Sequence, residues 1–172
     1  MNKYVVLLRA VNVGGKNLVP MKELKSHLEN KGLQNISTYI QSGNIVLQSE
    51  SSPTVLIQEV IESQFGFVPQ VLVLSESEFK QSIEKNPFDE EEGKLIHFYY
   101  CQESPAIDDE KLQKYCSETE RYQLVDKVFY LYAPNGIGRS KLVANIESCL
   151  GVAATGRNLN TVNKIESMLR ID

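Results

Sequence analysis

The sequence has few of the residues from which metal sites, disulfide frameworks and membrane spans are built. Its 172 residues include three cysteines and two histidines, with no C-x-x-C pair, so we expect no metal site. No apolar run reaches the roughly 18 residues of a membrane span. Three separated cysteines are typical of buried thiols in a reducing compartment, and the apolar run at 4–8 is too short for a signal-peptide core. We therefore expect a cytoplasmic protein with no membrane partner.

Positive charge is also scarce, and no familiar catalytic motif is present. The chain has 18 Lys and Arg against 22 Asp and Glu, a net charge of −4, which speaks against non-specific binding to duplex nucleic acid. No G-x-S-x-G elbow occurs, and the G-x-x-x-x-G-K-[ST] phosphate loop is absent. A general base is not apparent from any spacing, so the sequence leaves enzymatic activity open.

What the sequence does contain is a regular succession of strand and helix patterns. Continuous apolar runs predict strands, and apolar residues at helical spacing between Pro, Ser or Asp and Gly predict helices. In the first half we expect strands at 4–8, 36–40, 45–48 and 68–74, with helices between them and a third helix from Ser75. In the second half we expect strands at 95–101, 122–125, 128–132 and 152–155, with helices at 108–116, 137–150 and 158–169.

The order of elements repeats after about 85 to 90 residues, as expected when one supersecondary unit is used twice. The clearest trace is Phe65-Gly66-Phe67 against Leu150-Gly151-Val152, each ending the second helix of its half. The shared plan is βαββαβ with an extra helix, that of ferredoxin-like folds. The predicted fold class is therefore α+β, an internal duplication of two ferredoxin-like subdomains at 1–88 and 94–172, joined by an acidic bridge at 89–93.

This topology brings polar, glycine-containing loops together at one end of each half. The loop after the first strand meets the turn between the second and third strands, and in the second half the loops after the third and fourth strands meet. Glycines, free N–H groups and Arg or Lys are what an anion site requires. The expected ligand-binding residues are Arg9, Asn12, Gly14, Gly15, Lys16, Gln41, Ser42, Asn44, Arg139, Ser140, Lys141, Arg157, Asn158 and Asn160.

A purely structural interpretation of the same residues stays open. Glycine-rich loops mostly form turns, and Asn, Ser and Thr mostly cap helices; Asn158 has the position of an N-cap, and Gly43 that of a turn residue. Aromatic residues on the strands 95–101 and 128–132 lie where RNA-recognition domains stack bases. The matching RNA-recognition signature is missing, and such rings also fill cores well.

Six sequence blocks in order resemble the bacterial family of domain of unknown function 1697. They are 7–17 (LLRAVNVGGKN), 19–21 (VPM), 38–44 (TYIQSGN), 86–88 (NPF), 138–141 (GRSK) and the T-x-RN-x-NT block at 155–161. Gly156 and Leu159 stand where the family commonly has Ala and Trp. The resemblance implies two ferredoxin-like subdomains and brings no established activity, cofactor or substrate.

Three functions remain as hypotheses. The first is a binding module for a small anionic ligand or for nucleic acid, through the polar loops. The second is an enzyme acting on a phosphorylated or carboxylated metabolite, which needs a perturbed acid or base in the same pocket. The third is a protein-interaction module that uses the tyrosine-bearing strands. The sequence leaves the oligomeric state open.

Overall fold

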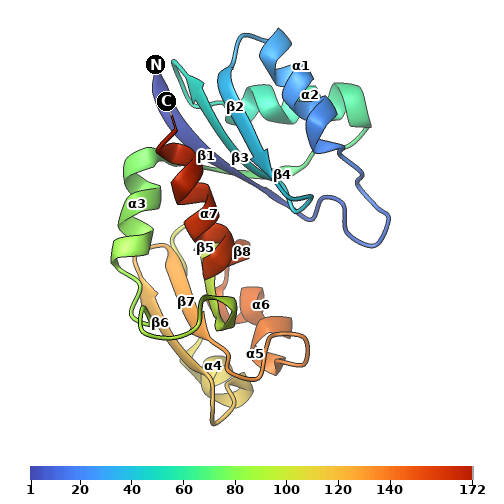
Figure 1. The fold of residues 1–172 in the computed structure, drawn as a ribbon. Coiled ribbons are helices and arrows are strands. Elements are labelled where there is room, and N and C mark those ends of the chain that lie inside the picture. Colours follow the sequence, from blue (N-terminus) through green and yellow to red (C-terminus); the bar gives the residue numbers. More distant parts are fainter. Residues whose placement is uncertain (172) are drawn as a thin grey trace. The chain divides into compact units, whose positions relative to one another are not determined.

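Eight strands pair into two four-stranded antiparallel sheets in the computed structural model, which describes residues 1–171 (Figure 1). The chain divides into two units, Met1–Gln81 with Lys164–Asp172 (unit 1) and Ser82–Asn163 (unit 2). Both unit boundaries fall inside helices, α3 (Glu76–Glu84) and α7 (Leu159–Leu169). The mixed α+β class is confirmed. The domain bounds 1–88 and 94–172 stay a prediction, because a unit defined by its contacts need not fold alone.

Unit 1 contains the first sheet, in the order β2-β3-β1-β4. Its elements are β1 (Asn2–Arg9), α1 (Met21–Asn30), β2 (Gln34–Tyr39), β3 (Asn44–Ser49), α2 (Thr54–Phe65) and β4 (Gln70–Ser75). Alternation along β1 sends Val6 and Leu8 into one core with Leu24 of α1 and Ile61 of α2, because successive side chains of a strand face opposite ways. One sheet face is therefore covered by α1 and α2, as Figure 1 shows.

Unit 2 repeats the arrangement with the order β6-β7-β5-β8. Its elements are β5 (Ile96–Cys101), α4 (Asp109–Tyr115), β6 (Arg121–Val125), β7 (Val128–Tyr132), α5 (Lys141–Ala144), α6 (Ile146–Leu150) and β8 (Ala154–Asn158), after a 3₁₀ turn at Gly93–Leu95. Phe129 and Leu131 pack with Leu112 of α4 and Leu142 of α5 in the core. Tyr130, on the other face of β7, meets Phe98 edge-on with ring centroids 4.7 Å apart.

The glycines that mark the repeat occupy equivalent positions in the two units. Gly66 ends α2 with φ 83° and Gly151 ends α6 with φ 73°, both left-handed. Each donates its N–H to the helix, Gly66 to Glu62 O at 3.1 Å and Gly151 to Glu147 O at 2.8 Å. Glycine is favoured in this position because it takes a left-handed conformation without a Cβ clash.

Two predicted elements of the second half differ in the structure. The single helix expected at 137–150 is two short helices, α5 and α6, interrupted at Asn145 with φ −119°. The Asn145 side chain donates to Lys141 O at 2.8 Å, a local bond that competes with the helix. The strand expected at 152–155 runs instead over Ala154–Asn158, because its pairing with β5 extends from Cys101 to His97.

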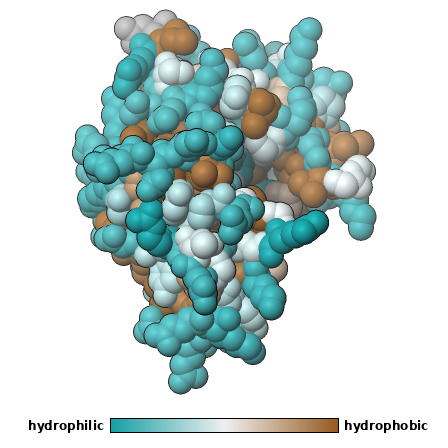
Figure 2. Space-filling model, turned by 60° about the horizontal axis from the view of Figure 1, so that its bottom comes forward, coloured by the Kyte–Doolittle hydropathy of each residue, from teal (hydrophilic) through white to brown (hydrophobic). Residues whose placement is uncertain are grey.

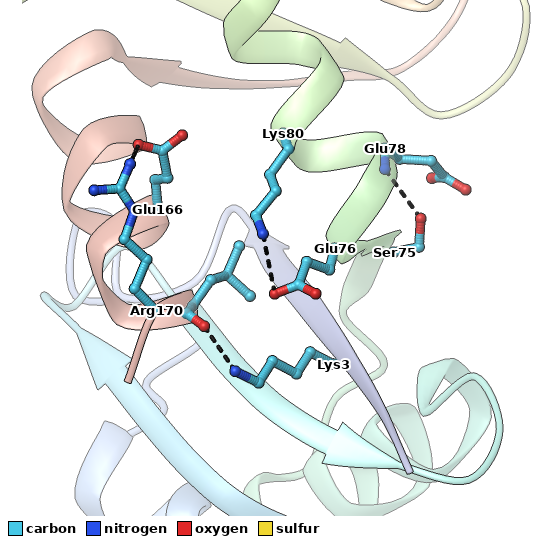
Figure 3. A network of polar contacts seen from close by, with 8 residues as sticks. Lys3, Ser75, Glu76, Glu78, Lys80, Glu166 and Arg170 are labelled. Carbon is cyan, nitrogen blue, oxygen red and sulfur yellow. Dashed lines mark hydrogen bonds and ion pairs between the residues drawn. The ribbon is translucent and has the colours of Figure 1, made fainter. Parts of the chain in front are cut away.

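The C-terminal turn of α7 is tied to β1 within unit 1. Lys3 Nζ donates to Leu169 O at 2.8 Å (Figure 3). The last carbonyls of a helix lack intrahelical partners and carry its negative end, so a cation is favourable there. The nearby Arg170–Glu166 pair, at 2.7 Å, is an i,i+4 contact at the surface and contributes little by comparison.

The Asn-Pro-Phe block at 86–88 packs against the sheet of unit 2 through Phe88. The guanidinium of Arg121 lies 4.6 Å from the Tyr132 ring centroid and 5.5 Å from that of Phe88. Arg121 also pairs with Glu91 of the acidic segment at 2.9 Å. A cation over two rings that also pairs with a carboxylate holds the segment 88–91 on β6 and β7.

Gly43 is the glycine whose replacement we expect to cost most. With φ 89°, it lies so near β1 that an added Cβ would be 2.6 Å from Leu8 Cβ; Gly32 has a similar φ of 93° but open space around it. We expect Gly32→Ala to lower the unfolding free energy by about 1 kcal/mol through strain alone, and Gly43→Ala by about 3 kcal/mol because overpacking adds to it. Urea denaturation measures both, and equal losses would contradict the close approach.

Candidate functional site

The loop after β1 ends in a small exposed hairpin. Val13 and Lys16 form a bridge around Gly14 and Gly15, whose φ values are 60° and 74°. Two successive left-handed residues suit the tightest hairpin turn, and glycine takes them without strain. The backbone N–H of Lys16 donates to Val13 O at 3.0 Å. The two glycines are therefore explained by the turn, and they leave the lysine exposed at the tip.

Asn12 joins this loop to the β2–β3 turn. Its Nδ2 donates to Val19 O at 3.0 Å and to Gln41 O at 2.8 Å, and its Oδ1 accepts from Val19 N at 2.8 Å. The two loops expected to meet in the first half are therefore brought together. The side chain of Asn12 has both its donor and acceptor atoms engaged in doing so.

The other polar residues proposed in the first half are also held by bonds within unit 1. Asn44 is fully buried, and its Nδ2 donates to Tyr39 O and to Ser42 Oγ, both at 3.0 Å. Arg9 Nη1 donates to Gln70 Oε1 at the start of β4. Among the residues proposed in the first half, Lys16 is the exposed cation of the Val13–Lys16 hairpin.

The proposed residues of the second half separate into two groups. Asn158 caps α7 by accepting from Thr161 N at 2.9 Å, as its N-cap position suggested. Asn160 Oδ1 lies against Gly93, and Arg157 Nη1 donates to Gly156 O at 2.9 Å. Burial lowers the pKa of Arg157 to about 10. These three residues do not line the cavity that Arg139, Ser140 and Lys141 share.

That cavity, which we call the α4–α5 pocket, lies wholly within unit 2. It has a volume of about 420 Å³ and lies between the C-terminal end of α4, the residue before β6 and the loop leading into α5; its lining includes Lys114, Cys116, Glu120, Arg139, Ser140 and Lys141. The three cations are exposed, whereas Glu120 and Ser140 are half-buried. The surface in Figure 2 is mostly hydrophilic, with hydrophobic side chains in small groups.

Glu120 is held firmly in the α4–α5 pocket. Its Oε1 accepts from Ser117 N at 2.9 Å, and its Oε2 accepts from Ser140 Oγ at 2.5 Å. Ser140 Oγ in turn accepts from Val143 N at 3.2 Å, so the serine hydroxyl has both a donor and an acceptor role. Bonds to a carboxylate are about twice as strong as neutral ones, which fixes the position of this negative charge.

The thiols are poor candidates for nucleophiles. Burial raises the pKa of Cys101 to about 11, and raises that of Cys149. Cys116 lines the pocket and is half-buried, which corrects the expectation of three buried thiols; burial and then the Glu120 charge raise its pKa. Because the thiolate is the reactive form, none of the three is activated.

Most aromatic residues of β5 and β7 are inside the structure, and Tyr132 at the end of β7 is half-buried. Phe98, Tyr100, Phe129 and Tyr130 are at most 2% exposed. The hydroxyl of Tyr130 donates to Ser82 O at 2.6 Å, and that of Tyr100 lies 2.9 Å from Ser82 Oγ. Rings buried in this way are unavailable for stacking on bases.

The described residues 1–171 contain no group of three His, Cys, Asp or Glu side chains able to hold a metal ion. Among the same residues, no helix combines the length and the apolar character that crossing a membrane requires.

Sequence reasoning missed the part of the pocket that α4 and β6 contribute. Lys114 and Cys116 belong to a helix end, and Glu120 belongs to an ordinary turn with an N–H bond from Glu120 to Ser117 Oγ at 3.3 Å. The sequence patterns there predict only a helix end and the connection to the next strand. The pairing of Arg121 with Tyr132 brings this segment beside the loop that follows β7, and only the sheet register reveals it.

Comparison with known proteins identifies relatives. The family described as "Protein of unknown function (DUF1697)" matches residues 1–130. The solved structure of a conserved bacterial protein from Streptococcus pneumoniae is similar over 98% of this chain and 99% of that chain, with 26% sequence identity and a TM-score of 0.69. No curated protein matches. Glu120 lies within the matched family range, and Arg139 to Lys141 lie beyond it.

His97 gives a prediction for stability against pH. Its Nε2 is buried and is without a hydrogen-bond partner in residues 1–171, and burial lowers its pKa below the usual 6.5. Below about pH 6.5, His97 therefore binds a proton more readily in the unfolded chain than in the folded one. The free energy of unfolding then falls as the pH drops, by at most about 1.4 kcal/mol per pH unit. We expect His97→Leu to flatten this decline in urea denaturation between pH 7.5 and 5. A decline of unchanged slope would contradict it.

Proposed function

The chain belongs to the DUF1697 family, and from that premise we propose that it is a binding module for a small anionic ligand, held in the α4–α5 pocket. One observation carries the proposal: Lys114, Arg139 and Lys141 border a single cavity of about 420 Å³ in a chain of net charge −4. Cavities of 300 to 1,000 Å³ are typical of ligand sites. Three like charges around one hollow repel one another, and an anion between them relieves that repulsion.

In the described part of the chain, none of these three cations is held in an ion pair. No ion pair joins any of them to a carboxylate within residues 1–171, and Lys114 Nζ instead lies 5.3 Å from the Tyr115 ring centroid. Arginine adds the ability to grip a phosphate or carboxylate with two parallel bonds. The chemistry therefore favours a phosphorylated or carboxylated small molecule.

Nucleic acid is the weaker form of this proposal. The strand aromatics are buried except Tyr132, which is half-buried and packs against Arg121 and Phe88, and this leaves little of the stacking platform that single-stranded binding uses. Lys16 and the exposed hairpin of unit 1 remain as a second proposed contact surface. Asn12 and Asn44 support that surface through their bonds to backbone carbonyls, and Ser42 accepts from the Asn44 side chain, so their role in it is to position the loops.

We further propose that each unit has ferredoxin-like topology. The orders β2-β3-β1-β4 and β6-β7-β5-β8, with antiparallel pairing throughout, support this assignment. We also propose a cytoplasmic location, since Cys101, Cys116 and Cys149 are free thiols of the kind that a reducing compartment preserves.

An enzyme acting on the same ligand is a second candidate, favoured by Glu120. A carboxylate in the pocket is a group that can accept a proton from a bound substrate. The test is ³¹P and ¹H NMR of phosphorylated metabolites incubated with the protein. New product signals that Glu120→Gln abolishes would favour the enzyme, and unchanged spectra in the presence of demonstrated binding would leave the binding module.

The proposed function predicts ligand-dependent stabilisation that needs Arg139. A ligand present at about 100 times its dissociation constant adds about 2.7 kcal/mol to stability, which corresponds to about 5–10 °C for a chain of this size. We expect at least one phosphate ester or carboxylate in a thermal-shift panel to produce such a shift. We expect Arg139→Ala and Lys141→Ala to reduce it strongly.

The matched control is Lys94→Ala, which removes a cation of unit 2 whose side chain is 69% exposed and paired with Glu92. It changes the net charge equally but lies outside the pocket lining. A shift that disappears equally in all three variants would indicate general charge screening, and no shift with any compound would refute the anion site.

A further inference from the structure

The α4–α5 pocket has a negative charge as well as positive ones, and the two signs do not neutralise each other. Glu120 accepts from Ser117 N and Ser140 Oγ, yet no ion pair joins it to Lys114, Arg139 or Lys141. Opposite charges in one cavity commonly collapse into a salt bridge unless something holds them apart. Here the two neutral donors hold the carboxylate in place.

The carboxylate also has unused capacity to accept hydrogen bonds. An ionised carboxylate offers about four lone-pair sites, and the bonds from Ser117 and Ser140 occupy two of them. The hydroxyl of Ser140 is already committed, because its proton goes to Glu120 and its oxygen accepts from Val143 N at 3.2 Å. The remaining sites of Glu120 therefore suit a donor supplied by a ligand.

A plain anion fits this arrangement poorly. Bound between the cations, it would lie in the same cavity as the fixed Glu120 charge, and like charges at short range disfavour each other. A ligand that carries an N–H or O–H group beside its anionic group replaces this repulsion with a charge-assisted hydrogen bond. The cations are exposed and Glu120 is half-buried, so the anionic group of such a ligand would lie nearer the solvent and its donor group deeper in the pocket.

Resting on the proposed function, we infer that Glu120 makes the pocket selective for anions that also carry a hydrogen-bond donor, an ammonium or a hydroxyl, a few bonds away. The ligand class is then a phosphorylated or carboxylated compound with an amine or alcohol group. Arg139 and Lys141 bind its anionic end, and Glu120 accepts from its donor.

The experiment compares three phosphate esters of the same carbon skeleton: ethyl phosphate, 2-hydroxyethyl phosphate and 2-aminoethyl phosphate. Their dissociation constants are measured by isothermal titration calorimetry for the full chain. We expect at least one of the two donor-bearing esters to bind about tenfold more tightly than ethyl phosphate, in line with a hydrogen bond to a charged group. Comparing the amine with the alcohol identifies the preferred donor.

The variant Glu120→Gln tests the role of the carboxylate. Its amide oxygen still accepts from Ser117 N and its amide nitrogen donates to Ser140 Oγ, so circular dichroism and the thermal midpoint report an intact fold. In this variant we expect the preference for the donor-bearing ester over ethyl phosphate to fall below about threefold, mostly because ethyl phosphate binds more tightly. Glu118→Gln is the matched control, because it removes an exposed carboxylate two residues away that is outside the pocket lining and should leave the preference unchanged.

The failures can be told apart. If wild type binds all three esters equally and Arg139→Ala weakens all three, the anion site stands and the selectivity is overturned. If Glu118→Gln erases the preference as fully as Glu120→Gln, general electrostatics explains it and the role of Glu120 is overturned. If none of the three esters binds the wild-type chain, the proposed function fails and the selectivity fails with it.

Discussion

The first strand of each unit, an interior strand of its sheet, is the constraint on which the arrangement depends. β1 pairs with β3 and β4, and β5 pairs with β7 and β8, so both are hydrogen-bonded along their two edges. All six residues of β5 are buried. The chain leaves β1 or β5 and later returns twice to pair along its two edges. The loops that begin and end these returns therefore lie at the ends of the sheet. The positions of the Asn12 loop and of the loop before α5 follow from that pairing.

Polar loop residues in this chain serve the backbone more often than they serve the surface. Asn12, Asn44 and Asn158 each bond backbone groups of neighbouring segments. Such groups are costly when left unsatisfied near a core. Loops rich in Asn, Ser and Gly are therefore explained by the structure alone. The stronger indication of a ligand comes from the charged side chains of the α4–α5 pocket that form no ion pair within residues 1–171.

Most of the fold could be predicted from the sequence because its signals are local. Apolar runs located the strands, and Gly66 and Gly151 ended equivalent helices with left-handed φ values. The two errors had different causes: a local side-chain bond at Asn145 and a tertiary strand pairing at β8. Asn145 interrupts an apolar periodicity that continues through it, and β8 takes its bounds from its register with β5.

The candidate site was predictable only in part, for the same reason. Arg139, Ser140 and Lys141 stand together in the sequence, so a basic loop was visible. Glu120 is 20 residues away from its partner Ser140, and nothing in its local pattern marks it. Its contact depends on the antiparallel pairing of β6 with β7, which places Arg121 opposite Tyr132.

Because the β6–β7 pairing places Glu120 beside Ser140, it also affects which ligands the α4–α5 pocket would favour. A basic loop alone would attract any anion, and its affinity would fall steeply with salt. A carboxylate fixed by two donors within the same cavity works against that attraction, at a cost in affinity for plain anions. Unpaired charges of both signs, held apart by the bonds from Ser117 N and Ser140 Oγ, have a complement only in a ligand that carries both an anionic group and a donor. Under the proposed function, the Glu120–Ser140 bond is the feature that makes this basic surface distinguish among anions.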